Sequence, residues 1–279
     1  MTRNLPITII DVFAEQPLAG NQLAVVRDAA GLTDVQMQDI AREMNFSETT
    51  FVTAQQAGAA DVRIFTPGAE LPFAGHPTVG TAWQLSGGTG SITLNLAAGP
   101  VAVEFEDGVG WMTPPEVTFS GTLDNETAAE LVGLSAEELG PLPVEFAQVG
   151  PQFVLVPVRT LASLKRARFD ADKRAALIDA GHPAKSVFLF TDEAYDPQAQ
   201  YASRMFFDAA SIREDPATGS ANTAFAAYLR KHLGPVGAVV VDQGVEMLRP
   251  SRLYLDIGPV IRVGGKVQPV LSGEISVPS

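Results

Sequence analysis

Two stretches of the sequence follow the same plan, a turn of small residues that leads into an apolar helix. In the first, Leu71-Pro72-Phe73-Ala74-Gly75 precedes a helix predicted to run to about residue 85. In the second, Asp215-Pro216-Ala217-Thr218-Gly219 precedes a helix rich in alanine. Arg63-Ile64-Phe65 and Arg204-Met205-Phe206 occupy corresponding places before the two turns. This pattern indicates an internal duplication, and each half contains one helix that is apolar on all sides and is therefore buried.

The start of each predicted helix is a candidate binding site. Gly75 suits a tight turn, because glycine adopts backbone conformations that a residue with a Cβ resists. Pro77 suits the first helical position, where its missing N–H costs nothing. Free backbone N–H groups at a helix start carry a partial positive charge and bind anions, including carboxylates. We therefore expect the turns at Gly75 and Gly219, one from each half, to converge on one anionic small molecule.

The composition narrows the classes of partner. Nineteen basic and thirty-two acidic residues give a formal charge of −13, which predicts a surface that repels nucleic acid and anionic membranes. The chain has no cysteine, which excludes disulfides and thiolate metal sites and favours a reducing, cytoplasmic compartment. No apolar run long enough to span a membrane and no signal-peptide pattern is present. The sequence has three histidines and lacks metal-binding and nucleotide-binding motifs, so we expect no metal and no cofactor.

The pattern of apolar runs predicts an α+β protein in which strands outnumber helices. We expect two halves, residues 1–117 and 118–269, with a C-terminal strand at 270–279 that returns to the first half. An apolar helix in each half requires a cover on every side. The predicted architecture is therefore a curved sheet or barrel wrapped around a central helix, repeated about a pseudo-twofold axis.

Local signals define one further helix in the first half. Thr33 and Gln36 have the spacing of a capping box and predict its start. Val35, Ile40 and Met44 are the expected inner face, and Asn45 is expected to end the helix in a left-handed conformation.

Four motifs, spread in order over nearly the whole chain, carry a family resemblance. They are Asp11-Val12-Phe13 with Gly20-Asn21, Asn45-Phe46-Ser47-Glu48-Thr49, Phe73-Ala74-Gly75-His76-Pro77-Thr78, and Asp215-Pro216-Ala217-Thr218-Gly219-Ser220-Ala221. Together they resemble the phenazine-biosynthesis (PhzF-like) isomerase family, which shares the duplicated fold of diaminopimelate epimerase. The epimerase relatives have a cysteine in each glycine turn, where this chain has Ala74 and Thr218, so two-thiol chemistry is excluded. Gln22 and Ala217 replace the proline and valine that are usual in the family.

The resemblance implies a cofactor-independent isomerase, often a homodimer, that acts on a small carboxylate similar to a dihydro-hydroxyanthranilate. It assigns proton transfer between carbons to Glu48 and the positioning of the substrate to His76, Asp208 and Ser220. The remaining substrate-binding residues that we expect are Asn21, Gly75, Thr218 and Gly219.

Each of these side chains also has a purely structural explanation. Most glutamates in a turn are solvated, but Glu48 opens an apolar strand, so we expect partial desolvation and a raised pKa. His76 could be a helix cap or a core histidine, Asp208 a turn carboxylate and Ser220 a helix cap. Asp215, before Pro216, is interpreted as a cap or turn residue.

Two other functions remain open at this stage. Ser220, His76 and Asp208 could form the nucleophile triad of a hydrolase. Against this, Ser220 lies at a predicted helix start and lacks the Gly-x-Ser-x-Gly motif of a nucleophile elbow. A non-catalytic protein that binds a small carboxylate would also keep the glycine turns.

Overall fold

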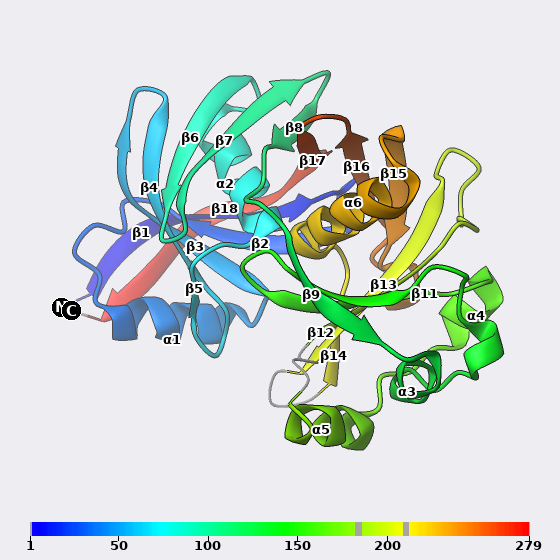
Figure 1. The fold of residues 1–279 in the computed structure, drawn as a ribbon. Coiled ribbons are helices and arrows are strands. Elements are labelled where there is room, and N and C mark those ends of the chain that lie inside the picture. The colour runs from blue at the N-terminus through cyan, green and yellow to red at the C-terminus, as the bar shows by residue number, and fades with distance from the viewer. Residues whose placement is uncertain (1, 182–185, 209–211, 279) are drawn as a thin grey trace. The chain divides into compact units, whose positions relative to one another are not determined.

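The computed structural model describes residues 2–181, 186–208 and 212–278. The chain forms two compact units, Met1–Pro114 with Gly264–Ser279 and Pro115–Val263 (Figure 1). The boundary falls within Pro114-Pro115, shortly after a strand that ends at Met112. Two consecutive prolines have no N–H to donate to a strand ladder, which explains why the sheet is interrupted here.

The first unit is a β-rich body with two helices. Its strands are β1 (Thr2–Val12), β2 (Asn21–Val26), β3 (Glu48–Gln56), β4 (Ala59–Phe65), β5 (Glu70–Leu71), β6 (Gly90–Leu96), β7 (Gly99–Glu106), β8 (Val109–Met112) and β18 (Val267–Pro278). Its helices are α1 (Asp34–Met44) and α2 (Gly75–Ser86). The C-terminal strand β18 pairs antiparallel with β1 along its whole length, from Val267 opposite Val12 to Pro278 opposite Thr2.

The second unit has the same kinds of element in a similar order. Its strands are β9 (Thr118–Leu123), β10 (Val144–Gln148), β11 (Gln152–Pro157), β12 (Ser186–Thr191), β13 (Tyr201–Asp208), β14 (Ile212–Asp215), β15 (Gly237–Gln243) and β16 (Ser251–Ile257). Its helical segments are α3 (Asn125–Leu131), η1 (Ala136–Glu138), α4 (Leu161–Arg166), α5 (Ala171–Asp179), α6 (Gly219–Leu233) and η2 (Val245–Met247). Strand β17 (Ile261–Gly265) crosses the boundary back to the first unit.

The strand pairings confirm the duplication. In the first unit β1–β2 is antiparallel, β2–β3 parallel, β3–β4 antiparallel, β4–β6 parallel and β6–β7 antiparallel. The second unit repeats these directions in β10–β11, β11–β12, β12–β13, β13–β15 and β15–β16. Because both sets include two parallel pairs at matching places, the two halves have one topology rather than a merely similar composition.

Each unit contains a buried helix, as predicted. In α2, every residue from Gly75 to Ala82 is buried, and the helix contacts strands β1, β2, β3, β6, β7 and β8. In α6, every residue from Gly219 to Leu229 is buried. Small residues permit this close packing: a Cβ on Gly80 would lie 2.6 Å from Val12 Cγ2 and 2.7 Å from Leu23 Cδ2.

Helix α1 has the predicted caps, and its inner face includes Ile40 and Met44 as predicted but not Val35. Thr33 and Gln36 form the capping box, and Asn45 ends the helix in the left-handed conformation, with φ of 52°. Met37, Ile40 and Ala41 are buried, whereas Val35 is 68% exposed, so the prediction for Val35 was wrong. Val35 is two residues from Met37, a rotation of about 200° around the helix, which places the two side chains on opposite faces.

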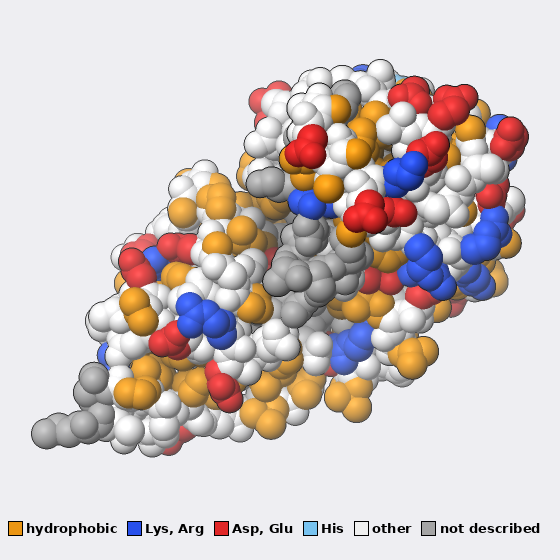
Figure 2. All heavy atoms as spheres, turned by 90° about the horizontal axis from the view of Figure 1, so that it is seen from below, with side chains coloured by type: hydrophobic (Ala, Val, Ile, Leu, Met, Phe, Trp, Pro, Cys, Tyr) orange, Lys and Arg blue, Asp and Glu red, His pale blue; other side chains and the backbone are white. Residues whose placement is uncertain are grey.

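On the face drawn in Figure 2, acidic and basic side chains are interspersed among small hydrophobic areas. Among the described residues, none of the helices has the length and apolar character needed to cross a membrane. The same part of the chain contains no group of three or more His, Asp or Glu side chains that could hold a metal ion.

Candidate active site

Glu48 lies where a helix cap passes directly into a buried strand. Asn45 ends α1, and Glu48 is the first residue of β3, where it pairs with Leu23 of β2. The four residues that follow, 49–52, are buried. The Glu48 side chain itself is 15% exposed, so its carboxylate lies at the edge of the core with limited access to water.

His76 lies beside Glu48. It is the second residue of α2 and is 3% exposed. Its Nδ1 lies 3.3 Å from Nδ2 of Asn21, the first residue of β2, and its Nε2 lies 3.5 Å from Oε2 of Glu48. Among the described residues Nε2 has no hydrogen-bond partner, although it is buried. The structure therefore brings together three of the predicted site residues, from β2, β3 and the start of α2.

Burial keeps the His76 ring neutral. Desolvation lowers the pKa of His76 from 6.5 to about 3, and a hydrogen bond to the Gln22 backbone opposes this effect only in part. A neutral imidazole places no full positive charge beside Glu48. The pair is therefore a neutral ring next to a carboxyl group rather than a permanent ion pair.

The start of α2 differs from the prediction in register. Gly75 is the first helical residue and is not among the described residues with positive φ, and Pro77 is the third helical residue rather than the first. The prediction that Gly75 uses a conformation that a residue with a Cβ resists was therefore wrong. The N-cap residue Ala74 makes no side-chain hydrogen bond to the first turn, so no side chain of the cap competes with an anion for these N–H groups.

The start of α6 in the second unit holds the other predicted residues. Gly219 and Ser220 begin the helix and are buried, and Thr218 is the N-cap residue. The Thr218 hydroxyl donates to Oδ2 of Asp215 at 2.5 Å and makes no capping bond to the helix. Asp215, which the sequence analysis interpreted as a cap or turn residue, is 4% exposed and is the carboxylate closest in the chain to this helix start.

Asp208 lies further from the start of α6 along the chain than Asp215 does. Its backbone ends β13, but its side chain lies outside the described residues. In the β13–β14 hairpin Asp215 pairs with Met205 and Asp208 pairs with Ile212, so Asp208 lies further along the hairpin, away from α6. The sequence signal that could have identified Asp215 is its place in the glycine-turn motif, directly before the helix.

Gln243, the last residue of β15, is a further residue at the start of α6 that the sequence analysis missed. It is fully buried, and its side chain bonds to Asp215, Thr218 and Asn222. Only the pairing of β15 with β13 brings it here, because Gln243 is 24 residues beyond Gly219 in a strand with no motif of its own.

The surroundings of His76 do not resemble those of a histidine in a nucleophile triad. In such a triad one ring nitrogen bonds to a buried carboxylate and the other to the nucleophile. Here Nδ1 lies beside the amide of Asn21, and Nε2 faces the carboxyl group of Glu48.

Comparison with known proteins identifies the family of this chain. The family model of phenazine biosynthesis-like proteins, PhzC-PhzF, matches residues 10–274. A trans-2,3-dihydro-3-hydroxyanthranilate isomerase of Pseudomonas aeruginosa is 38% identical over 253 positions, with 88% of each chain covered. An uncharacterized isomerase of Mesorhizobium japonicum is 35% identical over 306 aligned positions, with 99% of each covered. The crystal structure of a PhzF-family phenazine biosynthesis protein of Bacillus anthracis matches with a TM-score of 0.86 and 28% identity, covering 98% of this chain and 99% of that one. The chain therefore belongs to the PhzF-like family of isomerases and has the duplicated α+β fold of diaminopimelate epimerase.

Proposed function

We propose that this protein is a cofactor-independent isomerase that moves a proton between two carbons of a small, carboxylate-bearing metabolite. The observation that carries the proposal is the Glu48 carboxyl group, which opens a buried strand 3.5 Å from a neutral, buried His76. The Pseudomonas aeruginosa relative is named for trans-2,3-dihydro-3-hydroxyanthranilate, and a metabolite of this class is the substrate that we propose here.

The reaction needs one group that accepts a proton and then returns it. The Glu48 carboxylate takes a proton from carbon, and the electrons of the broken C–H bond move into the conjugated system of the substrate. The protonated carboxyl group, whose proton can exchange with water between the two steps, then delivers a proton to a second carbon on the same face, and the double bond moves accordingly. A single carboxyl group can perform both transfers if little water reaches it, and Glu48 is only 15% exposed.

His76 keeps the acid/base group in place without fixing its charge. Asn21 holds the ring through Nδ1, so Nε2 stays directed at Glu48. The neutral ring can share a hydrogen bond with the carboxyl group or with a polar atom of the substrate in either state of the reaction.

The helix starts supply the binding of the substrate carboxylate in this proposal. Gly75 and Gly219 are the first residues of the two buried helices, and the N-cap side chain of each helix makes no capping bond. The N–H groups at these helix starts can therefore bind an anion. The sequence predicted a carboxylate role for Asp208 in the second unit. We assign this role to Asp215 instead, because Asp215 lies at the start of α6, together with Thr218 and Ser220. A homodimer remains a prediction.

The test is the substitution Glu48→Gln, which keeps the shape of the side chain and removes proton transfer. With trans-2,3-dihydro-3-hydroxyanthranilate as substrate, we expect kcat to fall by about 10⁴-fold or more and KM to change little. In D₂O the wild-type protein should place deuterium on the carbon that receives the proton, and Glu48→Gln should place almost none.

Glu43→Gln is the matched control, because Glu43 is exposed on α1, five residues before Glu48. It should turn over the substrate at the wild-type rate. Near-normal turnover by Glu48→Gln together with an inactive Ser220→Ala would refute the isomerase proposal and favour a hydrolase.

A further inference from the structure

Four buried polar side chains form a cluster at the start of α6. Asp215 and Thr218 are 4% and 8% exposed, and Asn222 and Gln243 are fully buried. We call these four residues the α6 cluster. A buried polar group is costly unless it is hydrogen-bonded, so a cluster of four inside a core calls for a function or a structural need.

Gln243 is the centre of the α6 cluster. Its Oε1 accepts hydrogen bonds from the backbone N–H of Thr218 at 3.3 Å and from Asn222 Nδ2 at 3.0 Å. Its Nε2 donates to the backbone carbonyl of Asp215 at 2.9 Å and to Thr218 Oγ1 at 3.1 Å. One side chain from β15 therefore fixes the backbone on both sides of the turn that opens α6.

The hydroxyl of Thr218 connects Gln243 to the Asp215 carboxylate. It donates its single proton to Asp215 Oδ2 at 2.5 Å while it accepts from Gln243 Nε2. Hydrogen bonds in such a chain strengthen one another, and the last one is charge-assisted when the acceptor is an ionised carboxylate. Gln243 thereby directs the Thr218 proton toward Asp215 and sets the orientation of the carboxylate.

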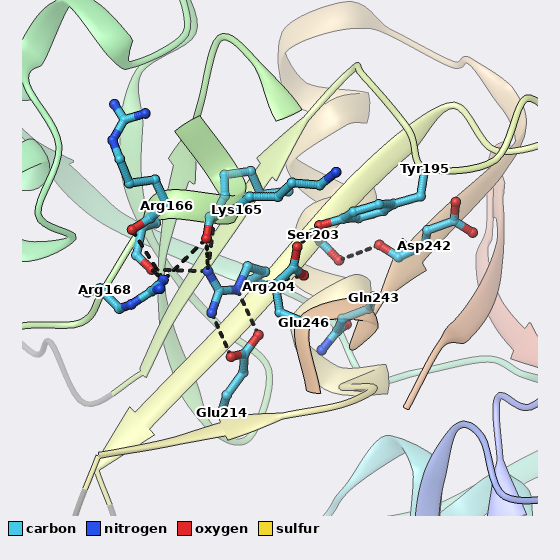
Figure 3. A network of polar contacts seen from close by, with 12 residues as sticks. Lys165, Arg166, Arg168, Tyr195, Ser203, Arg204, Glu214, Asp242, Gln243 and Glu246 are labelled. Atoms are coloured by element: carbon cyan, nitrogen blue, oxygen red, sulfur yellow. Dashed lines mark hydrogen bonds and ion pairs between the residues drawn. The ribbon is translucent and has the colours of Figure 1, made fainter. Parts of the chain in front are cut away.

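Glu214, the residue before Asp215, is held by Arg204 and not by the α6 cluster. Arg204 binds both carboxylate oxygens of Glu214, at 2.8 and 2.7 Å, and its Nη1 donates to the backbone carbonyls of Leu164, Lys165 and Ala167. Figure 3 shows the Arg204 guanidinium between Glu214 and the carbonyl of Lys165, and Glu246 Oε2 lies 4.0 Å from Arg204 Nε. The strand that carries Asp215 is therefore anchored by Arg204 just before it and by Gln243 just after it.

The duplication shows which residues occupy the same places in the first unit. In β4–β5, Phe65 pairs with Glu70 and Ile64 with Leu71, as Phe206 pairs with Glu214 and Met205 with Asp215 in β13–β14. Leu71 thus corresponds to Asp215. Counting from there, Ala74 corresponds to Thr218 and Thr78 to Asn222.

The parallel pairs locate the counterpart of Gln243. Asp61 pairs with Asn95 in β4–β6, and Ala202 pairs with Asp242 in β13–β15. Asp61 and Ala202 each lie two residues before the corresponding arginines, so Leu96 corresponds to Gln243. The fold therefore accepts leucine, alanine and leucine where the second unit has Asp215, Thr218 and Gln243, and the α6 cluster is not a requirement of the architecture.

We propose that Gln243 is a positioning residue for the isomerisation, acting through Thr218 on the Asp215 carboxylate and on the N–H groups that open α6. This inference rests on the proposed function, in which Asp215 and the start of α6 contact the substrate. In this role Gln243 acts from behind Asp215 and Thr218, to which its side chain is hydrogen-bonded.

The experiment compares Gln243→Leu, which installs the residue found at the equivalent place in the first unit, with the control Tyr228→Phe. Tyr228 also makes a buried hydrogen bond in the second unit, to the Pro143 carbonyl at 2.6 Å, but it lies nine residues into α6. Both variants should lose some thermal stability. Only Gln243→Leu should lose about 10- to 100-fold in kcat, the range typical of residues that orient a reacting group from behind.

A second variant, Thr218→Val, removes the connecting hydroxyl and leaves the backbone bonds of Gln243 in place. It should reduce kcat in the same way. When Gln243→Leu is added to Thr218→Val, kcat should fall by less than about 3-fold further, because both substitutions break the same chain of hydrogen bonds. Equal kcat values for Gln243→Leu and Tyr228→Phe, or fully additive losses with Thr218→Val, would overturn the inference. If Gln243→Leu does not fold, a normal kcat for Thr218→Val overturns it as well.

Glu48→Gln is measured in the same series, so that failure of the proposed function is distinguishable. An active Glu48→Gln variant refutes the proposed function, whereas an inactive one with a fully active Gln243→Leu refutes only the role of Gln243. If the wild type does not turn over trans-2,3-dihydro-3-hydroxyanthranilate, binding of anthranilate, which carries a comparable carboxylate, replaces kcat as the readout. Gln243→Leu should then weaken anthranilate binding by about 10-fold, and Tyr228→Phe should not.

Discussion

Mild acid should destabilise the first unit through one side chain, His76. Burial lowers the pKa of this ring in the native state from 6.5 to about 3. In the unfolded chain the ring is hydrated and takes up a proton near pH 6.5, so between pH 6.5 and 3 the unfolded state binds more protons than the native state. The stability that depends on the neutral ring is therefore present above pH 6.5 and is lost as the pH falls toward 3.

The magnitude follows from the distance between the working pH and the unfolded pKa. Each pH unit below 6.5 lowers the free energy of unfolding by about 1.4 kcal/mol, as long as the pH stays well above the native-state pKa of about 3. At pH 5.0 the expected loss from this ring alone is about 2 kcal/mol relative to pH 7.5 or higher. A loss of this size is a large part of the stability of an ordinary domain.

The assay is urea unfolding at pH 7.5 and pH 5.0, followed by tryptophan fluorescence. Both tryptophans, Trp83 in α2 and Trp111 in β8, belong to the first unit, so the signal reports on the unit that contains His76. The reference is His76→Gln, which keeps a polar amide near Asn21 but does not titrate. Other titrating groups are shared by the two proteins and cancel in the comparison.

The wild type should lose about 2 kcal/mol more between pH 7.5 and pH 5.0 than His76→Gln does. An equal loss in the two proteins would show that the ring takes up its proton at a similar pH in the native and unfolded states. The conclusion that a neutral, buried imidazole lies beside Glu48 would then be wrong. The argument that the acid/base group has an uncharged partner would fail with it.

The remaining predictions concern packing and ion pairs. Arg204→Met should lower the free energy of unfolding by about 3–5 kcal/mol, because it leaves the Glu214 carboxylate, only 14% exposed, without its partner. The equivalent Arg63→Met should cost about 1 kcal/mol or less, because Arg63 and Glu70 are 31% and 36% exposed, and equal costs in urea unfolding would contradict the comparison. Gly80→Ala should destabilise by about 1–3 kcal/mol despite the better helix propensity of alanine, since its Cβ would overlap Val12 and Leu23; a higher Tm would contradict this.

Much of the fold was predictable because its signals are local or repeated. The capping box at Thr33 and the left-handed end at Asn45 depend on a few neighbouring residues, and both are present. The duplication was visible because Arg63 and Arg204 precede equivalent glycine turns, and their matching ion pairs with Glu70 and Glu214 show that the two places are the same. The burial of both central helices followed from their apolar composition on all sides.

The errors concern quantities that a pattern does not specify. The inner face of α1 depends on the direction from which the sheet approaches, and Val35 lies on the opposite side. The start of α2 is two residues earlier than Pro77 suggested, because Ala74 takes the extended cap conformation and Gly75 is already helical. The assignment of the carboxylate role to Asp215 in place of Asp208 is a proposal that also uses the register of the β13–β14 hairpin.

The family, the isomerase class, the repeated fold and the short motifs that contain Glu48, His76 and Ser220 were all predictable from the order of the residues. These depend on residue types at fixed spacing, which the chain carries wherever it folds. Three further features came from the folded chain: Asn21, Glu48 and His76 meet, the His76 ring is neutral, and Gln243 bonds to the start of α6. The physical reason is that a pKa depends on the water that surrounding strands exclude, and a long-range hydrogen bond depends on strand register. Neither is a property of the residue or of its neighbours in sequence.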